Sequence, residues 1–241
     1  YNGPVVGGYP YVVRSSMEPE EKLNVPFDKP VITFNDEKAL KKSCYIYLKT
    51  LGISERLFND AFAKALKERE HTKAVLQEKQ KALFDQAVQD NKPVFVVAGR
   101  PYHTDPLIHQ KVGQILSDMG AEVFTDDIFR YEKSAGFSRL NIVSQWSYPN
   151  RVVQAAMELA KLPQNVQLLQ LNSFGFGPDS FFMDEIKEVL NQAGKNHTIL
   201  RIDEIASPGS VRLRMRSLIE SLKVIPAQTA QEIKPFESYK G

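Results

Sequence analysis

Two loops concentrate the residue types that can bind or transform a small ligand. The first, Gly99–Asp105, has a guanidinium, a phenol, an imidazole and a carboxylate directly after an apolar run. The second, Asn172–Asp179, combines an amide and a hydroxyl with two glycines, and its Pro178 suits the first position of a helix. A guanidinium pairs with phosphate or carboxylate through parallel hydrogen bonds, and the free N–H groups at a helix start attract the same anions. The two loops therefore predict a site for an anionic ligand.

We expect nine residues to line one cleft in this region. The ligand-binding candidates are Arg100, Tyr102, His103, Gln145, Trp146, Asn172, Ser173, Gly175 and Gly177. Arg100 would hold the anionic group of the ligand, because its planar fork suits phosphate or carboxylate. The two glycines would let the backbone approach the ligand closely. No residue is assigned as catalytic, and none as a metal ligand.

Several of these residues also have a simple structural interpretation. Asp105 precedes a proline and could serve only as a helix cap. Gly175 and Gly177 could serve the turn alone, and loose glycine loops are a weak signal. Tyr102 and His103 could satisfy backbone groups beneath their loop. The coincidence of both loops at one point of the predicted sheet favours the binding site.

Four apolar runs of strand length alternate with helical patterns in the second half of the chain. We expect strands at residues 94–98, 121–125, 166–171 and 198–202. Such alternation is typical of a parallel sheet with right-handed crossovers. In strand order 2-1-3-4 the two loops leave neighbouring strands where the order reverses, which is where such sheets bind ligands. The predicted fold class is α/β: a flavodoxin-like, doubly wound parallel sheet, preceded by a helical segment and part of a second α/β lobe.

The chain divides into four expected parts. They are a partial α/β lobe, a helical connecting segment, a flavodoxin-like domain and an extended C-terminal arm, at residues 1–33, 34–92, 93–225 and 226–241. The first part is rich in Gly and Pro around short β-branched runs at 5–6 and 11–13, which indicate strand ends and loops. In the second part Asn35 or Asp36 suits the start of one helix and Ser54 the start of another. After Pro106, a further helix is expected to continue to Met119.

Composition limits the classes of partner and compartment. A net charge of +2 over 241 residues gives no electrostatic reason to expect nucleic acid. No run approaches the ~20 apolar residues that a membrane-spanning helix needs. A single cysteine, Cys44, excludes a disulfide within the chain and favours a reducing compartment, so we expect a cytoplasmic protein. Because the chain opens at Tyr1 without a methionine, we also expect it to be a fragment of a longer protein.

Four segments resemble a known family. They read VVAGRPYHTDPLIHQKVGQIL, SQWSYPNRVVQAA, LLQLNSFGFGPDSFFMDEI and ILRIDEIASPGSVRLRMRSL. They resemble the activase-related proteins of the bacterial 2-hydroxyacyl-CoA dehydratase system, in the C-terminal, dehydratase-subunit-like region of CoA-substrate-specific enzyme activases. The opening GPVVGGYPYVV resembles the same region, so the likeness covers most of residues 1–222. It implies flavodoxin-like lobes that hold an iron–sulfur cluster and an acyl-CoA substrate, with ATP-dependent activase modules upstream.

Two positions depart from the pattern of that family. Gly3 stands where a cysteine precedes the Pro-Val-Val motif, and Phe176 stands where another separates the glycines of the Ser-Phe-Gly motif. Cluster irons need thiolates, and Cys44 cannot hold a four-iron cluster alone. We therefore expect no cofactor and no metal in this chain. Either the cluster has been lost, or its ligands come from outside the chain.

Two functions remain open from the sequence. The first is a ligand-binding or partner-binding region of an activase-related protein, without its own cluster. Its expected partners are a small molecule, such as an acyl-CoA or another anion, and the upstream activase domains. The alternative is a catalytic dehydratase-like subunit that acts on an acyl-CoA with cluster ligands from elsewhere, although the chain has no complete catalytic set. A flavin or nucleotide binder is a weaker third option, because the loop after residue 98 lacks the hydroxyl-rich phosphate cradle of a flavodoxin.

Overall fold

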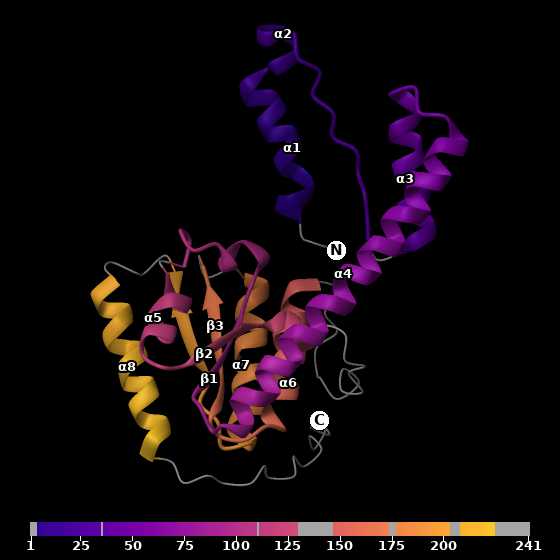
Figure 1. The fold of residues 1–241 in the computed structure, drawn as a ribbon. Helices are drawn as coiled ribbons and strands as arrows, with labels where there is room; N and C mark the ends of the chain where they lie inside the picture. Colours follow the sequence, from indigo (N-terminus) through magenta and orange to yellow (C-terminus); the bar gives the residue numbers. More distant parts are fainter. Residues whose placement is uncertain are drawn as a thin grey trace, which may run out of the picture. The chain divides into compact units, whose positions relative to one another are not determined.

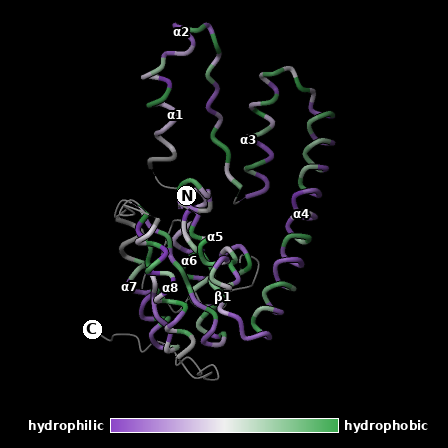
Figure 2. The backbone as a smooth tube through the Cα atoms, turned by 60° about the vertical axis from the view of Figure 1, so that its left-hand side comes forward, coloured by the Kyte–Doolittle hydropathy of each residue, from purple (hydrophilic) through white to green (hydrophobic). Residues whose placement is uncertain are grey.

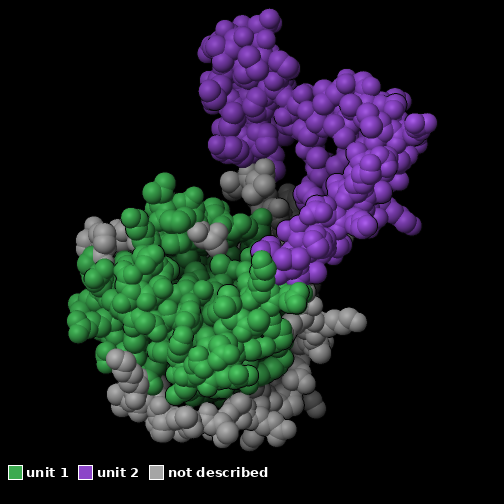
Figure 3. Space-filling model, in the orientation of Figure 1, with its two compact units in different colours: residues 1, 77–241 green, residues 2–76 purple. Residues whose placement is uncertain are grey.

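The computed structural model describes residues 4–34, 36–109, 111–129, 147–173, 177–202 and 208–224 (Figure 1). The chain consists of two compact units, one of residues 2–76 and the other of residues 77–241 together with residue 1 (Figure 3). The larger unit contains all the described strands. It therefore contains the expected switch point.

The larger unit is built on a four-stranded parallel sheet. Its strands are β1 (Val94–Ala98), β2 (Glu122–Thr125), β3 (Val166–Asn172) and β4 (Thr198–Arg201). They lie in the order β2-β1-β3-β4, and every neighbouring pair is parallel. The predicted α/β class and the predicted order 2-1-3-4 are confirmed. The two central strands, β1 and β3, are buried along their whole length, which explains the unbroken apolar run of β1.

Helices cover both faces of this sheet (Figure 1). The described helices of the unit beyond β1 are α5 (Val112–Asp118), α6 (Ser147–Ala160), α7 (Gly177–Gln192) and α8 (Pro208–Val224), with short 3-10 turns η1 (Pro101–Thr104) and η2 (Asp126–Phe129). Alternate side chains of β1 divide the core between the two faces. Val94 and Val96 pack with residues of α6 and α7, whereas Phe95 and Val97 pack with residues of α5 and α8.

The helix predicted from Pro106 is shorter than expected. Helix α5 begins only at Val112, after turns that follow η1. Lys111 has a φ of 60°, and a left-handed residue cannot continue a right-handed helix. The Asp105 carboxylate accepts the N–H of Leu107 at 2.8 Å, so it caps a turn rather than a long helix.

The smaller unit is helical in its described part. Its helices are α1 (Pro4–Met17), α2 (Pro19–Leu23), α3 (Glu37–Thr50) and the first part of α4 (Glu55–Gln89), which runs on into the larger unit. The strand ends predicted at 5–6 and 11–13 are wrong, because both runs lie within α1. Two or three β-branched residues have only a weak strand preference, and a helix satisfies its backbone without a neighbouring strand. The wider division of the chain into four parts stays a prediction, and its C-terminal arm lies outside the described residues.

Helices α3 and α4 begin where their caps were predicted. The Asp36 side chain accepts the N–H groups of Lys38 and Ala39 at 2.8 and 3.1 Å. The Ser54 hydroxyl accepts the N–H of Leu57 at 3.4 Å. Each bond satisfies an N–H group that a helix start leaves without a partner inside the helix.

Polar and apolar residues alternate along α4, the longest described helix (Figure 2). None of the described helices combines the length and the apolar character that a membrane-spanning helix needs.

Candidate functional site

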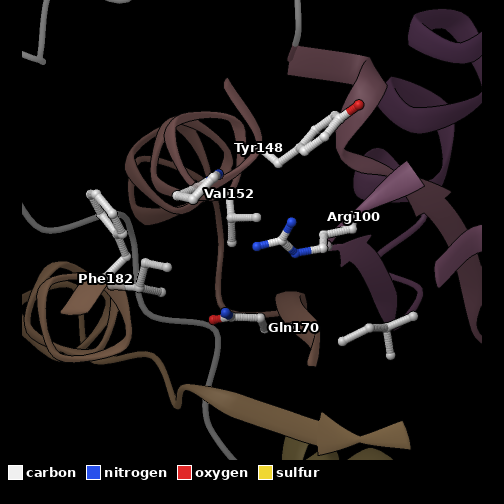
Figure 4. Close-up of a pocket in the computed structure, with 9 residues that line it drawn as sticks. Arg100, Tyr148, Val152, Gln170 and Phe182 are labelled. Atoms are coloured by element: carbon white, nitrogen blue, oxygen red, sulfur yellow. The ribbon is translucent and has the colours of Figure 1, made fainter. Parts of the chain in front are cut away.

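A small cavity lies at the carboxyl ends of β1 and β3 (Figure 4). Its walls come from these two strand ends and from α6 and α7, through Gly99, Arg100, Tyr148, Pro149, Val152, Gln170, Leu171, Phe182 and Ile186. The centres of water molecules can occupy about 20 Å³ of this partly open cavity. The cavity thus occupies the switch point where the sequence predicted a ligand.

Among the described residues, Arg100 and Gln170 supply the polar side chains that face this cavity. The Arg100 guanidinium points between Val152 and Gln170, whereas the Tyr148 hydroxyl points away from it (Figure 4). Much of the remaining wall is apolar and buried, notably Val152 and Phe182. Charge-assisted hydrogen bonds are stronger in such a low-dielectric setting than in water.

The Gln170 side chain is anchored by a histidine that precedes β4. His197 Nε2 lies 2.7 Å from Gln170 Oε1. Because an amide oxygen can only accept, His197 Nε2 must be protonated and donate this bond. Burial, and then the nearby charge of Lys187, lower the pKa of His197 to about 4. The imidazole is therefore neutral at pH 7 and fixes the orientation of the Gln170 amide.

The His103 imidazole lies beneath its own loop and is 1% exposed. The Arg100 N–H donates to His103 Nδ1 at 3.1 Å, and the His103 N–H donates to the Arg100 carbonyl at 2.9 Å. Since Nδ1 accepts, the ring proton is on Nε2, which donates to Ser173 Oγ at 3.1 Å. The imidazole thus satisfies backbone groups of the loop, as the structural interpretation of His103 required.

This tautomer argues against Ser173 as a nucleophile. A general base must take a proton from the attacking hydroxyl, but His103 Nε2 donates a proton to it instead. The Ser173 hydroxyl is 4% exposed, and the Tyr102 hydroxyl lies 3.4 Å from it. Tyr102, His103 and Ser173 therefore form a polar link between the two loops rather than a catalytic pair.

Asn172 shares the α7-covered face of the sheet with Gln170. Its Oδ1 accepts the N–H of Ser173 at 2.8 Å, and its Nδ2 lies 3.7 Å from Met183 Sδ on α7. Arg100 lines a cavity that also has walls from α7. Arg100 and Asn172 thus lie on one face, as the predicted cleft requires.

The structure places the nine predicted site residues in several groups. Arg100 lines the cavity, Asn172 packs toward α7, and the first residue of α7 is Gly177. The polar link described above contains Tyr102, His103 and Ser173. Three others lie outside the described residues: Gln145, Trp146 and Gly175. The role of the nine residues as one ligand site stays a prediction.

Sequence reasoning missed Gln170 and Tyr148 as cavity residues. The signal for Gln170 was an amide side chain two residues before the end of the strand, on the same face as the predicted site residue Asn172. Gln170 is 4% exposed, and a buried amide needs hydrogen-bond partners. Tyr148 offered no signal, because it follows a stretch without a clear helical pattern.

A second polar cluster lies where β2 ends, and no sequence motif predicted it. Arg151 Nη2 on α6 donates to Oδ1 of Asp126 and to Oδ1 of Asp127, both at 3.0 Å. Asp126 is 5% exposed, and its Oδ2 has no hydrogen-bond partner. Burial raises the pKa of Asp126 to about 6 although Arg151 opposes the shift. The cluster connects η2 to α6.

The residues of this chain do not fit an iron–sulfur cluster. A four-iron cluster needs thiolate ligands, and the chain contains one cysteine. Within the described ranges, no three His, Cys, Asp or Glu side chains gather in a way that could hold a metal ion.

Comparison with known proteins gives one family match. The model of the CoA enzyme activase uncharacterised domain (DUF2229) matches residues 1–129, more than half of the chain. The matched part includes the smaller unit, β1, the Arg100 loop and β2. Neither the curated proteins nor the solved structures gave a match. The family match agrees with the resemblance to activase-related proteins found in the sequence, and the chain belongs to the CoA enzyme activase uncharacterised domain family.

Proposed function

We propose that this chain is the ligand-binding region of an activase-related protein and holds the anionic part of a small ligand, such as an acyl-CoA. In this proposal the region has no iron–sulfur cluster of its own. The supporting observation is the Arg100 guanidinium, which points into a cavity at the switch point of the sheet. Open α/β sheets bind their ligands at this position.

The surroundings of Arg100 favour an anion over a neutral ligand. Apolar walls remove water, so a charge placed there needs a partner to offset its desolvation. A guanidinium has five N–H donors, so Arg100 can bind a ligand while it keeps bonds to the protein. Hydrogen bonds to charged groups contribute about 1.5–3 kcal/mol each.

The size of the cavity limits how much of the ligand can enter. The cavity is small, with about 20 Å³ for the centres of water molecules, so we expect only an end group of the ligand to enter it. The rest of an acyl-CoA would lie outside, against residues that border the mouth. Arg100 would thus recognise the charged end of the ligand, and other residues would hold its bulk.

Calorimetric titration with succinyl-CoA, an acyl-CoA that also has a free carboxylate, and with CoA and inorganic phosphate tests the role of Arg100. We expect Arg100→Ala to weaken the affinity about 10-fold to 100-fold, as the loss of a charged hydrogen bond predicts. Arg214→Ala is the matched control, because Arg214 is an exposed arginine on α8. It should leave the affinity within about twofold, since surface charges contribute little. Equal affinities of the wild type and Arg100→Ala would refute the proposed role.

Iron and sulfide analysis tests the absence of a cluster. The chain should be purified without oxygen and reconstituted with iron and sulfide. We expect no stoichiometric iron, because one cysteine supplies one thiolate. Iron and sulfide bound at cluster stoichiometry would favour a dehydratase-like enzyme instead.

A further inference from the structure

The hydrogen bond from His197 decides which polar atom Gln170 can offer to a ligand. His197 Nε2 donates to Gln170 Oε1 at 2.7 Å, so the amide oxygen is already used. The amide nitrogen, with its two N–H donors, is then the atom available on the cavity side. Arg100 also has donors only. The two polar side chains of the cavity therefore both donate, and neither accepts.

Two donor side chains at one cavity favour an acceptor group on the ligand. A carboxylate has two acceptor oxygens and no donor, so it matches both side chains. A primary amide or an alcohol would bring its own N–H or O–H against these donors and leave it unpaired, which costs affinity. The selection depends on which group donates and which group accepts each hydrogen bond, and not only on charge.

The apolar walls favour a carboxylate over a phosphate. A carboxylate carries one negative charge, which the guanidinium can pair through two parallel hydrogen bonds. A phosphate monoester carries nearly two negative charges at pH 7, and their desolvation between apolar walls costs more. The apolar neighbours Val152 and Phe182 suit the carbon chain that leads to a carboxylate.

We propose that the cavity binds the carboxylate end of a small acyl-type ligand, with Arg100 and Gln170 as donors. His197 is the positioning residue that turns the Gln170 amide nitrogen toward the ligand. This inference rests on the function proposed above and defines the chemical class of the ligand group at that site.

The test compares propionate with propionamide, which has nearly the same shape but replaces one acceptor oxygen by an NH₂ donor and has no charge. Ligand-observed NMR titration of the whole chain gives the affinity for each, and inorganic phosphate serves as the third probe. We expect propionate to bind at least about tenfold more tightly than propionamide, as one mismatched hydrogen bond predicts. We expect phosphate to bind more weakly than propionate. The ratio of two affinities on one sample does not depend on the folded fraction of that sample.

Variants of Gln170 distinguish its role as a hydrogen-bond donor from its role in packing. Gln170→Glu places a carboxylate beside Arg100, and should lower the affinity for propionate at least about tenfold. Gln170→Met keeps the volume but removes the donor, and should lower it less. Gln167→Met is the matched control: Gln167 is also buried in β3, but it donates to the Gln164 carbonyl and does not line the cavity. It should leave the propionate-to-propionamide ratio unchanged.

Variants of His197 test its positioning role. His197→Ala lets the Gln170 amide rotate, so the propionate-to-propionamide ratio should fall toward one. His197→Gln restores a donor to the Gln170 oxygen and should recover much of that ratio. A merely structural role of His197 would weaken both ligands equally and leave the ratio unchanged, which would overturn the positioning role.

The remaining outcomes distinguish this inference from the proposed function. If binding depends on Arg100 but propionamide equals or exceeds propionate, the Gln170 oxygen faces the cavity and the inference is wrong, while the proposed function stands. If phosphate binds more tightly than propionate, the carboxylate class is wrong. If binding of every probe is the same in Arg100→Ala, the proposed function itself fails.

Discussion

Gly99→Ala should destabilise the larger unit, because there is no space for a methyl group at this position. An added Cβ would lie 2.6 Å from His103 Nδ1 and 2.9 Å from the Leu171 carbonyl oxygen. The second atom belongs to the backbone of β3, so it can move only if the neighbouring strand moves. The first belongs to a buried ring that the Arg100 N–H and Ser173 hold from both sides.

Two costs add up in this variant. Forcing a methyl group into a packed region costs about 1–3 kcal/mol. Displacing the His103 ring breaks its bond with the Arg100 N–H and leaves buried polar groups unpaired, which costs about 1–3 kcal/mol more. We therefore expect the free energy of unfolding to fall by about 2–6 kcal/mol, which places this variant among the strongly destabilising mutations.

Urea unfolding followed by far-UV circular dichroism measures this change. Gly113→Ala in α5 is the control, since its Cβ would meet only Val123 Cγ1 at an ordinary 4.0 Å. There alanine should be neutral or stabilise by up to about 1 kcal/mol, through its higher helix propensity. If Gly99→Ala stays within about 0.5 kcal/mol of the wild type, the close approach between β1 and β3 is not as tight as described.

Three further predictions concern buried polar groups. The pKa of Asp126 is raised from 3.8 to about 6, so its stabilising contribution is complete below pH 3.8 and lost as the pH rises through 6. Relative to Asp126→Asn, the wild type should lose about 3 kcal/mol of unfolding free energy over this window in urea titrations, and parallel pH profiles would contradict this. Ser173→Ala should cost about 1–3 kcal/mol in thermal unfolding, because buried His103 Nε2–H loses its acceptor; an unchanged melting temperature would show that the bond adds nothing. Burial lowers the pKa of Lys195 from 10.5 to about 8, so its contribution is present above pH 10.5 and lost as the pH falls through 8. Relative to Lys195→Met, the wild type should therefore gain about 3 kcal/mol between pH 8 and 10.5, and no gain would contradict the lowered pKa.

The sheet was predictable because burial on both faces leaves a strong trace in the sequence. A parallel strand covered by helices on each side has few polar positions, as at Val94–Ala98. The alternation of strands and helices predicted parallel strands with right-handed connections. The order 2-1-3-4 is the one typical of the flavodoxin-like fold class. These rules act over whole elements, so they tolerate errors of a residue at the ends, such as the start of β2 at Glu122 rather than at 121.

The elements that were missed depend on single residues or on tertiary surroundings. Helix α1 contains β-branched runs that are typical of strands, and its local preference is too weak to decide between the two states. The late start of α5 depends on the left-handed Lys111 and on His109, whose Nδ1 accepts the N–H of Val112 at 3.1 Å. Neither the left-handed conformation of a lysine nor this hydrogen bond of a histidine can be predicted from the residue type.

The predicted cleft separates into a cavity and a polar link because successive residues of a strand point to opposite faces. Arg100 lies two residues after Ala98 and four after Val96, so its side chain points to the same face of the sheet as theirs. It extends into the cavity bordered by α6 and α7. A side chain at Gly99 would point to the opposite face of the sheet, where the His103 ring occupies the space. The two parts meet at Arg100, whose backbone bonds to His103 while its guanidinium faces the cavity. His103 and Ser173 therefore fix the position of the Arg100 backbone from outside the cavity, and their substitution should affect ligand binding only through Arg100.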